Sequence, residues 1–431
     1  MNESNLEIKR AKLRIPPEVK ALLSALHLSE PDTRHLAELS DEEWTSLLAF
    51  CNIAHLTLPL AQLSTKGFPN WVIERLRANL ADNALRFERV KSTYREAASV
   101  LKKAGIVHVV LKGFTQSPDY VSHPQLRSQS DIDIFCTPDS IDAASSALEA
   151  IGYRPLKENV SYAHADHGAT LVRPENWQWR GNPFDPDMPL GIELHFCFWN
   201  QRVSGIALPE TNSFWDRRTT RQVDGLSFSC LSTVDQLAYL TLHILRNIFL
   251  ADWIIHHVRE LAVFLHSGAD DEIFWQQWTK TYSSSLRSVQ AIAFYYARAW
   301  FGCRLHPLAT REIDRLPELL KSWLRAFSGS ALEIMFGLNK DSLWLQLILL
   351  SSPREKLKIF KRALLPTPCI SSIDSPVVRV RNKRPVQSSG NSPLRQYIDY
   401  LISRSATHMR ASLATMSRGL LWRVAQHFMT S

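Results

Sequence analysis

Two aspartates, Asp131 and Asp133, alternate with isoleucines in the segment DIDIF at residues 131–135. Side chains on a β-strand point to opposite faces with a period of two, so both aspartates would share one face while the isoleucines point into a core. With a rise of ~3.3 Å per residue, the two carboxylates would lie about 7 Å apart. Such a pair suits Mg²⁺, which takes one or two carboxylates and completes its shell with waters and substrate phosphates.

A candidate phosphate-binding turn precedes these aspartates. Residues 107–111 (VHVVL) are short, apolar and β-branched, which predicts a buried strand that runs directly into Lys112-Gly113. A glycine there would open a turn into a helix and let backbone N–H groups approach a phosphate, to which Lys112 adds a positive charge. Arg127 and Ser130 are further candidates for phosphate contacts. A structural ion pair for Arg127 and a turn hydrogen bond for Ser130 stay open as alternatives.

A third acid follows in a second alternating segment, residues 191–198 (GIELHFCF). Its alternation predicts a strand with the apolar side chains on one face and Glu193, His195 and Cys197 on the other. Glu193 therefore has the pattern of a further metal-side carboxylate, which would hold a second metal or accept the proton of an attacking hydroxyl. His195 would orient Glu193, contact the substrate, or make a structural hydrogen bond.

The elements that must position these residues come in a helix–strand–helix order. Period-3.6 patterns predict helices up to Lys103, with Ala81–Lys103 ending at a Gly105 cap, and the period changes to two from residue 107. The helical period returns at a Ser232 capping segment and continues over segments that include Glu312–Phe327. We therefore expect a helical region at 1–82, a core at 83–230, a helical domain at 231–352, and a basic linker with amphipathic C-terminal helices at 353–431.

Composition and cysteine usage restrict the class of protein. Of the 431 residues, 45% are hydrophobic and 21% charged, which is typical of a globular protein, and there is no long uncharged apolar run or signal-peptide core. The six cysteines form no CxxC pair, which argues against a disulfide framework or a structural zinc site and favours a reducing compartment. These features predict a cytoplasmic protein.

The positive charge is concentrated in the C-terminal region. Residues 353–431 carry a net charge of +11 and the rest of the chain −3, which together give the net charge of +8. An apolar stripe at helical spacing predicts packing against the helical domain; its members are Leu394, Tyr397, Ile398, Leu401, Ile402, Met409, Leu413, Met416, Leu420, Leu421, Val424 and Phe428. Its basic surroundings leave open an acidic partner, an anionic membrane surface or a polyanionic substrate. Nucleic-acid binding is not favoured, because the body is slightly acidic and lacks a basic, aromatic groove.

These marks together resemble a known family. The sequence is similar to the uncharacterised bacterial nucleotidyltransferases (family 5). The motifs that carry the similarity are, in chain order, Leu111-Lys112-Gly113, Arg127, Asp131-Ile132-Asp133-Ile134 and Ile192-Glu193-Leu194-His195, followed by a helix whose histidine looks like His243. That family lies within the DNA polymerase beta-like superfamily. The resemblance implies an α+β fold with a mixed-sheet nucleotidyltransferase core, flanked by N-terminal and C-terminal helical regions.

The same resemblance implies the chemistry and its ligands. Two Mg²⁺ ions would be held by Asp131, Asp133 and Glu193, and a nucleoside monophosphate would pass from an NTP to an unidentified acceptor. Lys112, Gly113, Arg127, Ser130 and His195 are the expected nucleotide-binding residues. The alternative is a catalytically silent scaffold of the same fold that binds a nucleotide or a partner.

His164 and His167 could suggest a separate metal site, but no third ligand with suitable spacing accompanies them.

Overall fold

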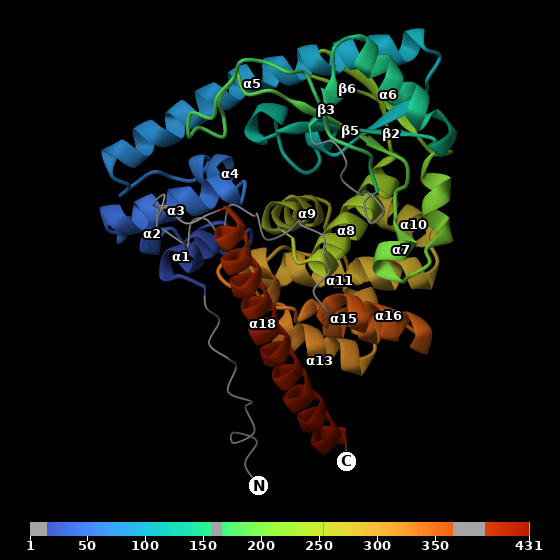
Figure 1. The fold of residues 1–431 in the computed structure, drawn as a ribbon. Coiled ribbons are helices and arrows are strands. Elements are labelled where there is room, and N and C mark those ends of the chain that lie inside the picture. The colour runs from blue at the N-terminus through green and yellow to red at the C-terminus, as the bar shows by residue number, and fades with distance from the viewer. Residues whose placement is uncertain (1–14, 157–165, 253, 365–392, 431) are drawn as a thin grey trace.

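The computed structural model describes residues 15–156, 166–252, 254–364 and 393–430 (Figure 1). Within these residues, one seven-stranded mixed sheet lies between two groups of helices, so the expected α+β fold is confirmed. The strands are β1 (His108–Leu111), β2 (Asp131–Cys136), β3 (Arg154–Pro155), β4 (Leu171–Val172), β5 (Gly191–His195), β6 (Thr219–Val223) and β7 (Leu226–Cys230).

The order of strands across the sheet is β3-β4-β5-β2-β1-β7-β6. The two strands with acidic side chains, β2 and β5, are parallel neighbours near its centre, while β1 is antiparallel to β2 and parallel to β7. The remaining pairs are antiparallel. Three-dimensional folding thus brings together two segments that are separated by about 60 residues in the chain.

One face of the sheet is covered by α5 (Asn70–Lys103) and α6 (Ile141–Ala150). Apolar side chains of α5, such as Val90 and Tyr94, share a core with Ile132 and Ile134 of β2. The isoleucines of the alternating segment therefore point into a core, as expected. At the end of α5, Gly105 takes a positive φ of 72°, which a glycine adopts without the steric cost that other residues incur.

The other face of the sheet contacts the large helical core, to which Val109, Leu111 and Phe135 belong. Figure 1 shows α8 and α9 beneath the sheet on this side. The helices after the sheet are α8 (Thr233–Leu250), α9 (Ile255–Ser267), α10 (Glu272–Thr281), α11 (Ser284–Phe301), α12 (Pro307–Asp314), α13 (Glu318–Phe327), α14 (Ser330–Glu333), α15 (Ser342–Leu349) and α16 (Pro353–Leu364). The N-terminal helices are α1 (Pro17–Ala25), α2 (Arg34–Ala37), α3 (Asp41–Ile53) and α4 (Thr57–Ala61).

Short helical segments connect these elements. They are the 3₁₀ turns η2 (Gly113–Gln116), η3 (Pro124–Leu126), η4 (Pro138–Ser140) and η5 (Pro209–Phe214), and the α-helix α7 (Gln201–Ser204). Lys112-Gly113 therefore leads into a 3₁₀ turn of four residues, where the sequence predicted the start of a helix.

Two sequence expectations differ from the structure. The predicted helix Glu312–Phe327 is two helices, α12 and α13, because Pro317 lacks the N–H that a helix interior needs. The strand β5 ends at His195, so Phe198 leaves the alternation and stacks on Phe135 on the opposite face from the one predicted. The expected boundary at residue 82 falls inside the continuous helix α5, and the division into domains stays a prediction.

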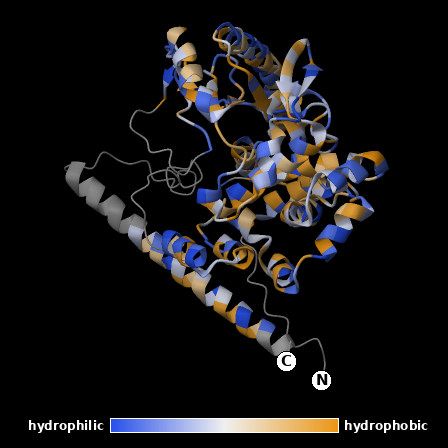
Figure 2. Ribbon diagram, turned by 90° about the vertical axis from the view of Figure 1, so that its right-hand side faces the viewer, coloured by the Kyte–Doolittle hydropathy of each residue, from blue (hydrophilic) through white to orange (hydrophobic). Residues whose placement is uncertain are grey.

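The C-terminal helix α18 (Pro393–Thr430) packs against the helical core, but of the predicted stripe Met416 packs there while five other members are exposed. Its buried side chains include Ala411, Thr415 and Trp422, while Met409 and Leu413 of the predicted stripe are exposed, as are Leu420, Leu421 and Val424. Figure 2 shows the middle of α18 along one edge of the body. The packed face is selected by shape, since Gly419 lets the Trp344 ring approach the helix backbone.

Two further expectations concern cysteines and membrane helices. The five cysteines in the described part of the chain are all unpaired. Among the same residues, every helix is too short or too polar to cross a membrane. His164 and residues 365–392, which belong to the region expected to contain the basic linker, lie outside the residues that the structure describes.

Candidate active site

The acidic side chains of β2 and β5 meet on the face of the sheet that looks toward the helical core. In the parallel register, Asp131 pairs with Gly191, Asp133 with Glu193, and Phe135 with His195. Paired residues on parallel strands project from the same face, and neighbouring strands lie about 4.8 Å apart. Glu193 therefore lies on the same side of the sheet as the aspartates.

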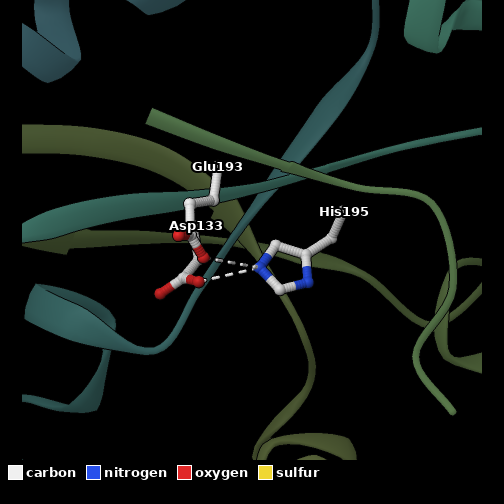
Figure 3. A group of neighbouring side chains, drawn as sticks. All are labelled: Asp133, Glu193 and His195. Atoms are coloured by element: carbon white, nitrogen blue, oxygen red, sulfur yellow. Dashed lines mark hydrogen bonds and ion pairs between the residues drawn. The ribbon is translucent and has the colours of Figure 1, made fainter. Parts of the chain in front are cut away.

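Asp133, Glu193 and His195 form a compact group (Figure 3). Their donor atoms all lie within 4.8 Å of one another. The Nε2 atom of His195 is 2.7 Å from Oδ1 of Asp133 and 4.0 Å from Oε2 of Glu193. His195 is almost fully buried, so its hydrogen bond fixes the orientation of the Asp133 carboxylate.

Lys112 points into this acidic group. Its Nζ lies 2.9 Å from Oδ1 of Asp133, the same oxygen that contacts His195. Burial alone would lower the pKa of Lys112, but the negative charges of Asp133, Asp131 and Glu193 outweigh that effect and raise it. Burial would likewise raise the pKa of Asp133, which Lys112 and His195 together bring below its ordinary value. The lysine is thus a charged partner of the carboxylates.

Among the residues that the structure describes, Asp131 has no ion pair like the one that Lys112 makes with Asp133, and its pKa is raised. Burial, reinforced by the nearby charges of Asp133 and Glu193, raises its pKa to about 7, despite the opposing charges of Lys112 and Arg127. Both causes disfavour the charged form of this carboxyl, and the second is the negative charge of its neighbours. An added cation would offset that charge.

Position 113 requires a glycine because of both its backbone angle and its surroundings. Its φ is 58°, and a Cβ at this position would lie 2.5–2.9 Å from the carboxamide atoms of Gln129. Gln129 in turn donates a hydrogen bond of 2.6 Å to the carbonyl of Asp131. The glycine therefore allows the turn after β1 to pack directly against the start of the acidic strand.

The structure places Arg127 and Ser130 at the edge of the group. Arg127 donates from Nε to Oε1 of Glu260 on α9 at 2.8 Å, which is the ion pair that the sequence left open. Ser130 is exposed just before β2, and its carbonyl accepts a hydrogen bond from the N–H of Gly191. The proposed phosphate contacts of both side chains stay predictions.

Four residues around the group were not predicted as part of the site. Thr170 donates a hydrogen bond of 2.7 Å to Oε1 of Glu193, and His167 Nε2 lies 3.7 Å from Oε2 of that residue. Buried Asp166 lies 4.0 Å from Nδ1 of His195 and pairs with Arg246 of α8 at 3.0 Å. The segment AHADH at 163–167 contains a partial signal, since its histidines suggest a weak metal motif, but that motif does not include Asp166. Its link to Glu193 depends on the β4–β5 pairing.

The donor set fits a divalent cation. Carboxylates from two neighbouring strands converge on one face, a buried imidazole orients one of them, and burial together with the neighbouring carboxylates raises the pKa of Asp131. Hard cations such as Mg²⁺ prefer oxygen ligands of this kind. In the part of the chain that the structure describes, no other cluster of three such side chains comes together.

Comparison with known proteins gives one match. A family model described as an uncharacterised nucleotidyltransferase matches residues 40–302, a range that contains the whole sheet and the carboxylate group. No curated protein and no solved structure matches the chain.

Proposed function

Since the chain belongs to this uncharacterised nucleotidyltransferase family, we propose that it is a Mg²⁺-dependent enzyme that transfers a nucleoside monophosphate from an NTP to an acceptor. The observation that carries the proposal is the convergence of Asp133 and Glu193 from parallel strands beside His195. Nucleotidyl transfer needs little covalent chemistry from the protein beyond positioning and charge stabilisation, which this arrangement supports.

Asp131, Asp133 and Glu193 are the residues that would hold two Mg²⁺ ions. When bound, the ions would supply neutralisation of the triphosphate charge and activation of the acceptor oxygen. Because Oδ1 of Asp133 already accepts from Lys112 and His195, its other oxygen is the one left for a cation. Thr170 holds one oxygen of Glu193 in the same way.

The remaining side chains would bind the nucleotide and manage the proton. Lys112 would move its hydrogen bond from Asp133 to a phosphate oxygen once cations balance the carboxylates. Glu193 would accept the proton of the acceptor hydroxyl. His195 would hold Asp133 in place, and Arg127 would add positive charge at the edge of the group.

The test is transfer of label from each of the four α-³²P-labelled NTPs, with Mg²⁺, to the protein itself and to a metabolite and protein extract. We expect label transfer by the wild type and its loss in Asp133→Asn. The matched control is Asp139→Asn, which changes an exposed acid a few residues along the chain. Equal transfer by wild type and Asp133→Asn would overturn the assignment.

One observation favours the alternative of a catalytically silent scaffold that binds a nucleotide or a partner. The Lys112–Asp133 ion pair already neutralises part of the acidic group without a metal. Such a scaffold would bind NTP equally well with EDTA and with Mg²⁺. The enzyme instead requires Mg²⁺-dependent NTP binding, so a calorimetric titration in both buffers separates the two functions.

A further inference from the structure

A pocket with a volume of about 190 Å³ lies on the helical side of the molecule and includes Arg127 in its lining. It is bounded by α4, the first turns of α9 and the segment around residues 120–128. The side chains that give it its chemistry are those of His55, Arg127, Ser128, His256, Arg259 and Glu260. They come from three parts of the chain, so the pocket exists only in the folded protein.

The pocket contains one more positive charge than its acid can balance. Glu260 is already engaged by Arg127 at 2.8 Å and by His257 at 3.4 Å. Arg259 makes no ion pair with any residue that the structure describes, and its buried Nε lacks a hydrogen-bond partner there. Burial lowers the pKa of Arg259 to about 10, so the guanidinium stays charged at neutral pH. A partly buried guanidinium whose Nε lacks a hydrogen-bond partner is costly, and an anion would compensate it.

Two further features of the pocket also favour an anion. The buried Nδ1 of His256 also has no partner among the described residues, and its ring packs between those of His55 and His257. His256 is the second residue of α9, which begins after Ile254, a side chain that cannot cap the helix. The N-terminus of a helix carries a partial positive charge and favours anions.

Arg127 connects the pocket to the carboxylate group. It lines the pocket, and its charge is among those that oppose the raised pKa of Asp131. A ligand bound at Arg259 would therefore share Arg127 with the proposed site of transfer.

We propose that this pocket is a phosphate subsite, in which the Arg259 guanidinium and the first turn of α9 bind a phosphate group of the substrate. Arginine offers a planar pair of N–H donors that matches phosphate oxygens. Of the two arginines that line the pocket among the described residues, Arg127 forms an ion pair with Glu260, whereas Arg259 forms none. The phosphate would come from the NTP or from a phosphorylated acceptor. That assignment to a substrate depends on the proposed function, whereas phosphate binding itself does not.

The experiment measures binding of inorganic phosphate to the full chain at low salt by calorimetry, together with the rise in melting temperature that phosphate produces. We expect Arg259→Gln to weaken phosphate binding by roughly tenfold or more, since hydrogen bonds to charged groups are lost. Arg304→Gln, which removes an exposed arginine that pairs with Asp270, is the matched control and should bind like the wild type. Arg259→Lys keeps the charge and should retain part of the affinity.

Binding of Mg²⁺ with each of the four NTPs then identifies the source of the phosphate. A parallel loss of NTP affinity in Arg259→Gln assigns the subsite to the NTP, whereas intact NTP affinity assigns it to the acceptor. Phosphate binding should persist in Asp133→Asn, so failure of the transfer reaction would leave the subsite standing. The inference is wrong if the wild type shows neither phosphate binding nor stabilisation, or if Arg259→Gln binds phosphate as tightly as Arg304→Gln.

Discussion

Glu193 pairs with Asp133 in the parallel register of β5 and β2, and both contact His195 from the same face of the sheet. This pairing puts two carboxylates within reach of one cation although about 60 residues separate them in the chain. It also gives the two acids different partners, since Lys112 and His195 hold Asp133 while Thr170 holds Glu193. Their proposed roles can therefore be separated by mutation.

Glu193→Gln should reduce transfer more than it reduces NTP binding. If Glu193 accepts the proton of the acceptor, we expect the transfer rate to fall by about 10²–10⁴-fold. NTP affinity should change far less, because Asp131 and Asp133 remain. Single-turnover transfer and equilibrium NTP binding measure the two quantities, and an equal loss in both would show that Glu193 acts only in binding.

His195→Gln should weaken metal binding without unfolding the protein. The histidine orients Asp133 through a buried hydrogen bond of 2.7 Å, and loss of such a supporting contact typically costs about 10–100-fold in metal affinity. Titration with Mn²⁺, followed by electron paramagnetic resonance, measures the affinity. His123→Gln, at an exposed histidine, provides the control, and identical Mn²⁺ affinity in both variants would contradict the positioning role.

Lys112→Met should make folding stability depend on Mg²⁺. Removing the buried ammonium leaves three carboxylates without their main counter-charge, which we expect to cost on the order of 3–5 kcal/mol in the free energy of unfolding. Mg²⁺ should then restore stability, because a ligand that binds only the folded state stabilises it. Urea unfolding in EDTA and in Mg²⁺ measures both effects. The interpretation fails if Mg²⁺ stabilises this variant no more than Lys102→Met, an exposed control.

Gly113→Ala should destabilise the protein more than Gly105→Ala. Both glycines have positive φ, but a Cβ at Gly105 meets nothing within 4 Å, whereas one at Gly113 would overlap Gln129. Both variants therefore incur the same cost for a positive φ. The difference between their free energies of unfolding measures the overlap with Gln129, which we expect to cost about 1–3 kcal/mol. Thermal unfolding of both variants measures it. Equal destabilisation would mean that Gln129 moves aside freely.

The Arg127–Glu260 pair should make stability sensitive to acid. Burial would raise the pKa of Glu260, but Arg127 and His257 lower it to about 2. A carboxylate with a depressed folded-state pKa stabilises the protein above its ordinary pKa of 4.5, and that stability is lost as the pH falls toward 2. We expect the pair to contribute on the order of 1–3 kcal/mol at pH 7.

Glu260→Gln tests this pH dependence. The variant should be less stable than the wild type at pH 7, and the difference between them should shrink at pH values below about 4.5. Guanidinium unfolding at pH 7, 5 and 4 measures the difference. If the difference in the free energy of unfolding between the wild type and Glu260→Gln stays constant or widens as the pH falls, Glu260 acts through packing and its charge does not contribute.

The sequence alone determined the local geometry of the site. Alternation with a period of two placed Asp131 and Asp133 on one face and Ile132 and Ile134 in the core, because strand geometry leaves only two directions for a side chain. The spaced motifs also identified the family, which the match over residues 40–302 confirms. The first inference rests on a short-range rule of strand geometry, and the second rests on several short motifs read in order along the chain.

Only the tertiary structure decided which distant groups surround that geometry. The contacts of Glu193 with Thr170, of Asp166 with Arg246, and of Arg127 with Glu260 join residues that are 23 to 133 positions apart. No local pattern encodes such pairs, because they depend on strand order and on how α8 and α9 pack against the sheet. The same reason explains the face of α18 that is buried, since the shape of Trp344 against Gly419 selected it over the more apolar stripe.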